Sequence, residues 1–434
     1  MKGLFSGVLV VCLIAFLVGP AFGETSAKDL EMQLEKLMNQ VKDMDAAMKA
    51  QKSEIEALQM KIKELQAREA APVAAAPAAA AKEEKVTSKY NIKIYGKIKF
   101  DGIYDTNNMG REEFITYIPK NANGEDKTTF NIKDTRLGVA ISAPSLNGWQ
   151  TSGRFESDFY GSDPGSNGGL RIRLAYVDFE KGGTSVRVGQ DWNQIAYMNP
   201  STLDFAIMGF NGNLWNRVPQ VTVRQKVGGG FEALLTAYRF RWSDDDTGSK
   251  VDTQIHMPWV GGKIAYAGKL IDPGKNAYLA LDGAVRNGEA GDNNVTPYLA
   301  ALELKVPIMV VELTGEAYMG QGLGLEYFHH RDSSNDAGAF NVKGHAILTR
   351  GGFLQLSAQP LKNVTVNVGY GLDDPKNADV KNDFYRKSQY TFSNIQVQLL
   401  KDITAGIEAA HVETDWATGD EHGTRYQTSL IYNW

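Results

Sequence analysis

The sequence of 434 residues contains one cysteine, Cys12, which lies in an apolar segment at the N-terminus. We expect export to remove this segment, and the mature chain then has no thiol. Disulfides, thiolate metal sites and covalent c-type haem attachment are therefore excluded. No later stretch is apolar enough to form a membrane helix. The formal net charge of −5 gives no indication of nucleic-acid binding.

Signs of an enzyme or metal site are also scarce. Of six histidines, only His329 and His330 are adjacent, and adjacent residues of an extended strand point to opposite sides. The loops containing SDDDTG and LDDP offer calcium ligands, although a solvated acidic loop is the favoured interpretation. No nucleophile stands beside a base in a known pattern. The sequence predicts a protein that is not an enzyme and that holds no cofactor or metal.

Residues 1–23 have the pattern of a secretory signal peptide. Lys2 supplies the positive start, LFSGVLVVCLIAFLV is the apolar stretch, and Ala21 and Gly23 precede a cleavage point near Glu24. A single-pass anchor is the alternative, but the run is shorter than the ~20 residues needed to span a membrane. We therefore predict an exported protein.

Residues 24–69 carry a heptad pattern that predicts a coiled coil. Lys and Glu fill the flanks, and the helix would form a rod of about 60 Å. A single amphipathic helix lying on another surface is the alternative. Residues 70–89, which include AAPVAAAPAAAAKEEKV, are predicted to be an Ala/Pro-rich linker. The apolar heptad residues are Leu30, Leu34, Leu37, Val41, Met44, Met48, Ile55, Leu58, Ile62 and Leu65.

From residue 90 to the end, apolar and polar residues alternate with the period of a β-strand. In NIKIYGKIKFDGIYD, Ile98 and Phe100 share one face, while Lys97 and Lys99 share the other. In LRIRLAYVDF, Leu170, Ile172, Leu174 and Tyr176 are expected to oppose Arg171 and Arg173. We predict sixteen strands, near residues 91–105, 130–143, 149–160, 170–179, 184–192, 218–226, 231–242, 257–268, 276–286, 295–306, 308–319, 346–358, 363–371, 387–399, 403–414 and 424–434.

Link lengths distinguish a membrane barrel from a soluble β-sandwich, which would alternate in the same way. Links after even-numbered strands are short, including EKGG, VGG and a break at Pro307. Links after odd-numbered strands are mostly long and polar, including residues 106–129 and the final DWATGDEHG. Short periplasmic turns and long extracellular loops are typical of outer-membrane barrels. We therefore predict an all-β transmembrane barrel over residues 90–434, with 16 antiparallel strands, preceded by the α-helical coiled coil.

The C-terminus ends on an aromatic residue in an alternating run. Leu430, Tyr432 and Trp434 lie on one face, which we expect to point to lipid and to act as an assembly signal. The last strand is predicted to pair with residues 90–105 and to close the barrel, because lipid does not tolerate an open sheet edge. An even strand number places both barrel ends, and hence the coiled coil, in the periplasm, where contact with peptidoglycan is a further possibility.

Several segments resemble strand motifs of DcaP-like trimeric porins: KIYGKIKFDGIYDT, DTRLGVAIS, GRFESDFYG, LRIRLAYVDF, VRVGQDW and RVPQVTVRQ. The resemblance is densest over residues 90–226. It implies sixteen strands, a periplasmic coiled coil, three parallel pores and passive uptake of small organic acids, dicarboxylates in particular. The anion-selective OprP group is a neighbouring possibility through its arginine-lined channel, but no signature here selects phosphate.

Strand parity places many cations on the lumen face of the first seven strands. A basic wall that attracts anions is the functional interpretation, and salt-bridged scaffold charges are the alternative. The lumen acids are expected to be fewer: Asp101, Glu156 and Asp158 in this region, with Asp282, Glu316 and Glu408 later. The predicted pore-lining cations are Lys97, Lys99, Arg136, Arg154, Arg171, Arg173, Arg187, Arg224, Arg239 and Arg241.

The third long loop is the most apolar of the eight, and its aromatic residues are poorly suited to water. We predict that it folds inward and narrows the channel, with a subunit contact or a lipid rim as alternatives. The residues assigned to this constriction are Tyr197, Asp204, Phe205, Phe210 and Trp215.

The predicted function is therefore an outer-membrane porin of a Gram-negative bacterium, for passive diffusion of small hydrophilic solutes and favouring anionic organic acids. A structural tether from outer membrane to cell wall is one alternative, and a barrel sheath for an electron-transfer partner is another. The porin resemblance implies a homotrimer in outer-membrane lipid, whereas Ile at a with Leu at d favours two strands.

Overall fold

The computed structural model describes residue 60 and residues 89–122, 124–161, 168–239, 253–327, 339–341, 343–376 and 385–434. The chain divides into two units, Met1–Val86 and Thr87–Trp434. The predicted signal peptide, coiled coil and linker up to residue 88, Met60 excepted, lie outside the described residues.

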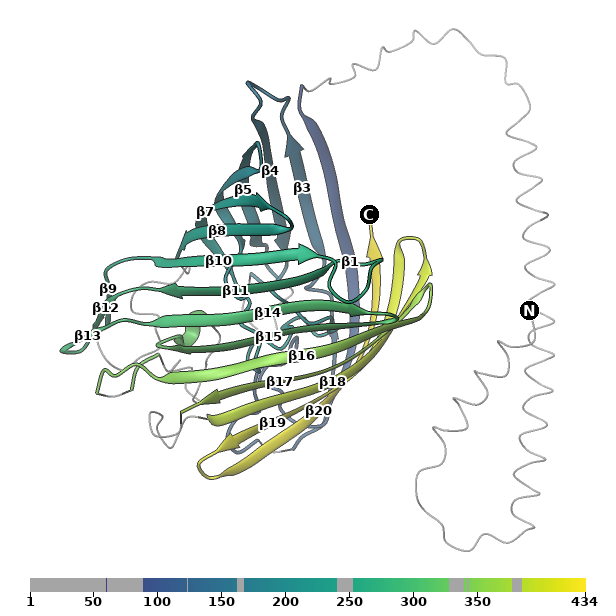
Figure 1. The fold of residues 1–434 in the computed structure, drawn as a ribbon. Coiled ribbons are helices and arrows are strands. Elements are labelled where there is room, and N and C mark those ends of the chain that lie inside the picture. Colours follow the sequence, from purple (N-terminus) through teal and green to yellow (C-terminus); the bar gives the residue numbers. More distant parts are fainter. Residues whose placement is uncertain are drawn as a thin grey trace, which may run out of the picture. The chain divides into compact units, whose positions relative to one another are not determined.

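The second unit is a closed antiparallel barrel (Figure 1). Each strand pairs with the next in the wall, and β1 pairs with β20 from Lys97↔Asn433 to Asp105↔Arg425. The short β2 and the following β3 both pair with β1 and form two halves of one wall position, so the wall has the predicted sixteen strands. The wall strands are β1 (Asn91–Asp105), β2 (Lys127–Asn131), β3 (Arg136–Ser142), β4 (Gln150–Asp158), β5 (Arg171–Lys181), β6 (Thr184–Trp192), β7 (Arg217–Gly228), β8 (Phe231–Tyr238), β10 (Trp259–Gly268), β11 (Ala277–Val285), β14 (Tyr298–Ile308), β15 (Val311–Gln321), β16 (Leu348–Leu361), β17 (Val364–Pro375), β18 (Tyr385–Leu400), β19 (Ile403–Trp416) and β20 (Gly419–Asn433).

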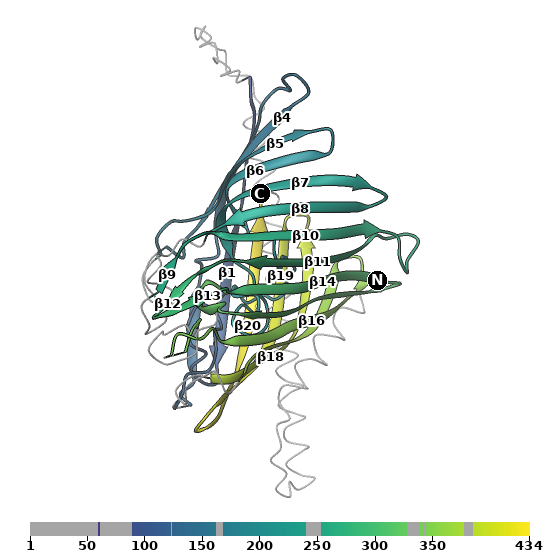
Figure 2. The same cartoon turned by 60° about the vertical axis from the view of Figure 1, so that its left-hand side comes forward.

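Smaller elements lie in the long links. β9 (Thr253–Ile255), β12 (Gly288–Ala290) and β13 (Asn293–Val295) form a separate three-stranded sheet, and η2 (Gly324–Tyr327) is a 3₁₀ turn. Figure 2 shows this small sheet at one end of the barrel and the short turns of β5–β6, β7–β8 and β10–β11 at the other. The predicted sorting of most short and long links to opposite ends is confirmed.

Three local predictions were wrong. The final link is not a long loop, because β19 and β20 continue to Trp416 and Gly419, which pair across a two-residue turn. Pro307 does not break the chain; it lies in β14 opposite Glu312, and the turn follows at residues 309–310. In β5, Leu174 pairs with Glu156 and Ile172 with Ser157, so Arg173 is an extra residue, and Leu174 is buried rather than facing the same side as Ile172. A β-bulge of this kind reverses parity beyond it and turns Tyr176 and Asp178 inward.

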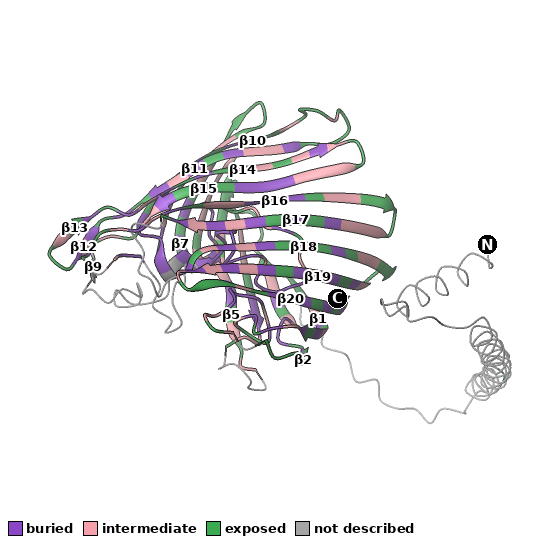
Figure 3. Cartoon of the chain, turned by 90° about the horizontal axis from the view of Figure 1, so that it is seen from below, coloured by how far each residue is buried: buried purple, intermediate pink, exposed green. Residues whose placement is uncertain are grey.

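The two faces of the wall differ in exposure as the alternation predicts. On β1, Ile98 and Phe100 are 54% and 45% exposed, whereas Lys99 and Asp101 are 3% and 2% exposed. Figure 3 shows the same alternation along β16 to β20. Among the described residues, no helix has the length and apolarity to cross a membrane. The outward face is the apolar one, as in a barrel whose outside contacts lipid.

The last residue closes the barrel, as predicted. Trp434 and Gly96 exchange backbone hydrogen bonds of 3.1 Å in both directions. A Cβ atom on Gly96 would lie 2.3 Å from the carbonyl oxygen of Arg136 and 2.7 Å from the Trp434 ring. Only glycine therefore leaves room for the terminal indole at this position.

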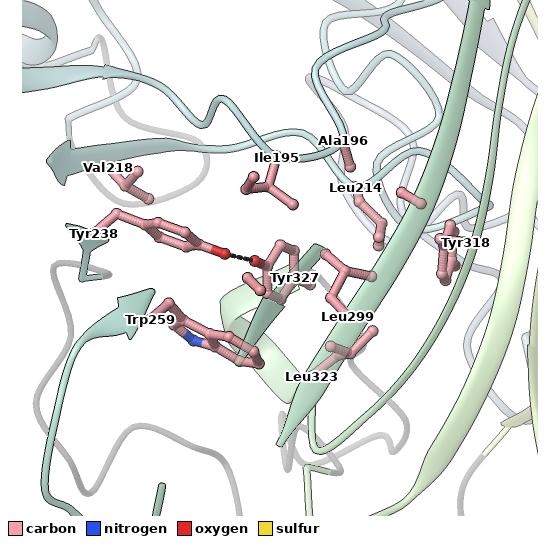
Figure 4. Packing of buried hydrophobic residues seen from close by; sticks show 12 residues of the cluster. Ile195, Ala196, Leu214, Val218, Tyr238, Trp259, Leu299, Tyr318, Leu323 and Tyr327 are labelled. Atoms are coloured by element: carbon pink, nitrogen blue, oxygen red, sulfur yellow. Dashed lines mark hydrogen bonds between the residues drawn. The ribbon is translucent and has the colours of Figure 1, made fainter. Parts of the chain in front are cut away.

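Much of the apolar core lies inside the barrel. Figure 4 shows one cluster in which Ile195 and Leu214, from the link between β6 and β7, pack with Tyr238, Trp259 and Tyr327. A second cluster joins Met109, Ile115 and Ile118, from the link between β1 and β2, to residues of β18 and β19. Two long links thus fold into the space enclosed by the wall.

Candidate channel constriction

The link between β6 and β7, residues 193–216, crosses the interior of the barrel. We call it loop L3. Asp204, Phe205, Phe210 and Trp215 are buried, whereas Tyr197 remains exposed. The sequence predicted an inward fold from the apolar character of this segment, and the described residues lie inward.

Carboxylates of the wall hold the backbone amides of L3. On one side, the amides of Ala196 and Leu214 donate to Asp282 on β11 and to Glu316 on β15, each at 3.2 Å. Across the interior, Glu408 on β19 accepts the amide of Leu203 at 2.6 Å and that of Asp204 at 3.1 Å. These acids were expected to be lumen charges, and they serve instead as acceptors that fix the loop.

Donors of the wall hold the L3 carbonyls in the same region. Lys99 Nζ on β1 donates to the carbonyl of Leu203 at 2.7 Å, and Gln427 on β20 donates to the same oxygen at 3.1 Å. Asn394 on β18 donates to the carbonyl of Ser201 at 2.8 Å. The loop is therefore bound to both sides of the wall, which satisfies buried backbone groups that would otherwise be costly.

Asp204 is the most connected side chain of L3. It accepts the amides of Ala206 at 2.9 Å and Ile115 at 3.1 Å, and it forms an ion pair with Arg425 at 3.1 Å. Burial raises the pKa of the Asp204 carboxyl, while Arg425 and the amides act in the opposite direction. Arg425 also binds Asp105 at 2.7 Å, so one buried guanidinium joins L3 to both β1 and β20.

The link between β1 and β2, residues 106–126, is a second inward loop that the sequence interpretation missed. We call it loop L1. Asn211 of L3 donates to the carbonyl of Thr116 at 2.7 Å, and Trp416 donates to that of Ile118 at 3.1 Å. The expectation of a wholly polar extracellular loop was wrong for its middle. The short run FITYI within that loop was the signal available in the sequence.

Most of the predicted pore cations have acidic partners. Lys97 and Arg136 bind Asp134 at 2.7 and 2.9 Å, while Arg171 binds Asp158 at 2.7 Å. Arg239 also has an interaction partner, and Arg241 lies outside the described residues. The remaining pairs are Lys99–Asp101, Lys99–Asp134, Arg173–Glu156, Arg173–Asp158, Arg187–Asp178, Arg187–Asp191 and Arg224–Glu232.

Lumen acids near this wall are more numerous than expected. Asp134 lies in the gap between β2 and β3, within the single strand predicted for residues 130–143, and the sequence interpretation did not select it. Asp178 was not among the predicted lumen acids, and the bulge in β5 turns it toward Arg187. Within the described residues, Arg154 has no carboxylate in ion-pair contact; its guanidinium lies 5.3 Å from the centre of the Tyr95 ring.

In several ion pairs of β1 to β5, the cation is more exposed than its carboxylate partner. The side chains of Arg136 and Lys97 are 28% and 16% exposed, against 5% for Asp134. Arg171 is 21% exposed, whereas Asp158 is fully buried. Arg173 does not share this exposure, because its side chain is 1% exposed. Lys99 is also buried, at 3%, and Asp178 on β5 is 20% exposed against 21% for Arg187. The cation is therefore the more accessible partner in the pairs that Lys97, Arg136 and Arg171 form.

L3 places aromatic rings against this wall. Phe205 stacks on Tyr160 with ring centres 4.1 Å apart, and the guanidinium of Arg171 lies 5.4 Å from the Phe205 ring. Arg217, which the sequence interpretation did not select, lies 5.1 Å from the Trp192 ring and 5.0 Å from the Trp215 ring. The site is thus a row of arginines braced by aromatic faces, an arrangement that keeps guanidinium groups fixed.

Carboxylates also gather outside this site. Among the described residues, Glu413, Asp415 and Asp420 have ligand atoms within 4.8 Å of one another. They lie near the turn joining β19 and β20, on the outward parity of those strands. They take no part in the constriction.

The geometry is that of a sixteen-stranded barrel with an inward third loop and a charged wall opposite. A family model described as Gram-negative porin matches residues 70–302, more than half of the chain. The chain belongs to the Gram-negative porin family. This porin is consequently an outer-membrane channel and not an enzyme.

Solved structures share the fold of this porin. The outer membrane channel DcaP of Acinetobacter baumannii matches with a TM-score of 0.66 and 20% identity, covering 80% of this chain and 97% of that one. An anion-selective porin from Comamonas acidovorans matches with a TM-score of 0.55 and 16% identity, over 80% and 100% of the two chains. A trimer form of OmpT from Vibrio cholerae matches with a TM-score of 0.52 and 9% identity, covering 80% of this chain and 100% of that one. Among curated proteins, none matches the porin significantly.

Proposed function

We propose that this porin lets small anionic solutes diffuse across the outer membrane and favours organic acids, dicarboxylates in particular. The observation that supports the proposal is the exposure of Lys97, Arg136 and Arg171 in front of their buried carboxylate partners. Arginine binds a carboxylate through two parallel hydrogen bonds, which chloride cannot match. Similarity to an anion-selective porin is consistent with this preference.

The selectivity arises because a solute passes close to the charges of the wall, and not because the wall binds it tightly. Wall charges are felt across a channel narrower than the ~8 Å Debye length of physiological salt. A unit charge pair about 4 Å apart near a protein surface interacts by roughly 4 kcal/mol, and less where acids compete. The buried acids behind the arginines moderate the attraction, so that an anion is admitted and released again.

The test neutralises the exposed cations together. Replacing Arg136, Arg154 and Arg171 by Gln should shift the reversal potential of the purified channel toward cations and slow dicarboxylate entry into liposomes. Arg173→Gln is expected to leave selectivity nearly unchanged, because its side chain is 1% exposed. Replacing Lys269, Lys362 and Lys401 by Gln is the matched control, since these cations lie in turns between strands.

Two results contradict the proposal. One is a native channel that already prefers cations. The other is a triple variant whose ion preference equals that of the turn-lysine control.

We also propose a homotrimer with the N-terminal coiled coil in the periplasm. The trimer form of one structural relative supports the number three. The tether function is compatible with a porin and depends on the same N-terminal segment. A sheath for an electron-transfer partner is disfavoured, because L1 and L3 occupy the interior that such a partner would need.

A further inference from the structure

Two histidines and three carboxylates share the outward face of the hairpin that β19 and β20 form (Figure 1). The segment HVETDWATGDEH holds all five. The intervening Val412 and Thr414 on β19 are buried, as is Gly423 on β20, so the opposite parity of each strand faces outward. The five outward residues are His411, Glu413, Asp415, Asp420 and His422.

The register of the hairpin brings these side chains together. Glu413 pairs directly with His422, and Asp415 pairs with Asp420. The imidazole rings of His411 and His422, which are diagonal neighbours, have centres 6.0 Å apart. The sequence interpretation treated residues 415–423 as a loop, in which His422 had no defined neighbour. The cluster exists because both strands continue to the turn.

His411 is oriented to bind an ion. Its Nδ1 lies 2.9 Å from Oγ1 of Thr424, the residue directly opposite. A proton on Nδ1 that is donated to this hydroxyl leaves the lone pair of Nε2 available. Metal-binding histidines are commonly supported in this way, by a hydrogen bond at the ring nitrogen that does not bind the metal.

The carboxylates repel one another unless a cation joins them. Ligand atoms of Glu413, Asp415 and Asp420 lie within 4.8 Å of one another, and like charges directly opposite destabilise a strand pair. Lys387 on β18 binds Oδ2 of Asp415 at 2.9 Å and offsets one of the three charges. Oδ1 of Asp415 is buried and accepts no hydrogen bond from the described residues. Two negative charges therefore remain for a dication to neutralise.

The cluster lies on the water side of the apolar band. The exposed Trp434 and His422 are twelve residues apart with the same parity. That separation is about 40 Å along the strand. At a tilt of about 40° it corresponds to about 30 Å of height, against an apolar band of about 25 Å. Tyr426, which stacks on Tyr104 with ring centres 6.3 Å apart, lies four residues closer to the band. A hydrated ion in the medium can consequently reach the cluster.

Imidazole and carboxylate ligands together select a transition-metal dication. Zn²⁺ binds nitrogen and oxygen ligands, in a tetrahedral arrangement as a rule. Calcium prefers a larger set of ligands that consists of oxygen atoms. His411, Asp420 and His422 are exposed, so rotation of their side chains can bring them onto one ion together with Glu413.

We propose that this hairpin binds one transition-metal dication, represented by Zn²⁺, at the outer end of the wall. His411 and His422 supply nitrogen ligands, and Glu413 and Asp420 supply oxygen ligands. Asp415 lies beside the ion and adds to the negative potential. The ion joins β20, the strand that closes the barrel, to its neighbour β19. The inference does not depend on which solutes the channel carries.

The test measures Zn²⁺ binding to the full-length protein, without a histidine tag, by isothermal titration calorimetry in detergent. The double variant His411→Gln/His422→Gln should bind Zn²⁺ at least about tenfold more weakly than the native protein, because two ligands are lost. The matched control is His256→Gln/His345→Gln, which removes two exposed histidines elsewhere in the described chain. It should bind like the native protein.

Asp420→Asn distinguishes a metal ligand from a residue needed only for folding. With EDTA present, this variant should unfold at a higher urea concentration than the native protein, because it removes the like-charge contact with Asp415. Zn²⁺ should raise the urea midpoint of the native protein more than that of the variant, since an ion that binds the folded state stabilises it.

Three results overturn the proposal. The first is equal Zn²⁺ affinity in the double histidine variant and its control. The second is tighter binding of Ca²⁺ than of Zn²⁺, since an acidic calcium site does not need the imidazoles. The third is a urea midpoint of Asp420→Asn that falls below the native value both with EDTA and with Zn²⁺.

Discussion

At the scale of single residues, wall carboxylates act as acceptors for the backbone of a loop. Asp282, Glu316 and Glu408 each receive at least one L3 amide, and Glu408 receives two. A carboxylate with two acceptor oxygens is well suited to this role, because adjacent amides can each take one. The acids of the barrel interior thereby position the constriction instead of competing with the arginines for solutes.

Glu408→Gln tests this role. A neutral amide side chain offers one acceptor oxygen, so one of the amides of Leu203 and Asp204 loses its partner, at a cost of about 1–3 kcal/mol. We expect larger current fluctuations in single-channel recordings, because L3 is held less firmly on that side. Glu413→Gln, on the outward parity of the same strand, is the control. Identical recordings for both variants would show that Glu408 does not hold the loop.

Gly96 is the second residue whose role is predictable. An alanine there would force its Cβ against the Arg136 carbonyl and the terminal indole, at 2.3 and 2.7 Å. We expect Gly96→Ala to lower the free energy of unfolding by about 1–3 kcal/mol through overpacking. Urea unfolding in detergent, followed by tryptophan fluorescence, measures this change.

The control for Gly96 is Gly262→Ala. The nearest heavy atom to an added Cβ at Gly262 is 3.5 Å away, at ordinary contact distance. Equal stability losses in the two variants would argue against a special fit between Gly96 and Trp434.

At the scale of elements, L3 and L1 form one inward assembly. Ile115 and Thr116 of L1 bind Asp204 and Asn211 of L3, and both loops reach β18 to β20 through hydrogen bonds or apolar contacts. The backbone hydrogen bonds between wall strands do not involve either loop. We therefore expect the channel width to be set by loops that the wall does not require for its own strand pairing.

Shortening L3 is the test at this scale. Trp192 pairs with Arg217, so the ends of the loop are adjacent, and a short Gly–Ser linker can replace residues 195–214. Conductance should rise by about twofold or more, since the narrowest segment limits ion flow. Replacing residues 289–294, in the small sheet outside the wall, is the control and should leave conductance unchanged. An unaltered current in the L3 variant would exclude L3 as the constriction.

At the scale of the whole molecule, closure of the barrel wall and association of several chains depend on different parts of the sequence. The pairing of β1 with β20 completes the wall within a single chain, so one chain encloses a complete barrel. The heptad segment lies in the other unit of the chain. A coiled coil adds contacts between subunits without contributing to the wall.

Deleting residues 27–69 tests whether association of the chains can be separated from conduction through the pore. We expect a lower fraction of trimers in native mass spectra at equal detergent concentration, and an unchanged conductance per pore. A full-length protein that is dimeric would show that the Ile and Leu heptad positions outweigh the analogy with trimeric relatives. Loss of conductance on deletion would contradict the separation of pore and coiled coil.

The barrel could be predicted from local patterns in the sequence. Alternation along β1, the sorting of short and long links, and the aromatic end at Trp434 predicted sixteen strands and their closure, and both are confirmed. These properties are readable because strand periodicity and link length are local features of a chain. The inward fold of L3 was visible for a similar reason, since its apolar residues are contiguous in sequence.

The pairing of charges inside the barrel depends on the three-dimensional fold. One bulge at Arg173 reverses the parity of β5 and brings Asp178 to Arg187, and the gap between β2 and β3 presents Asp134 to Lys97 and Arg136. Contacts such as Asp204 with Arg425 join residues more than two hundred positions apart. Pairing across the barrel depends on register and on the path of L3, and neither is encoded in a local pattern.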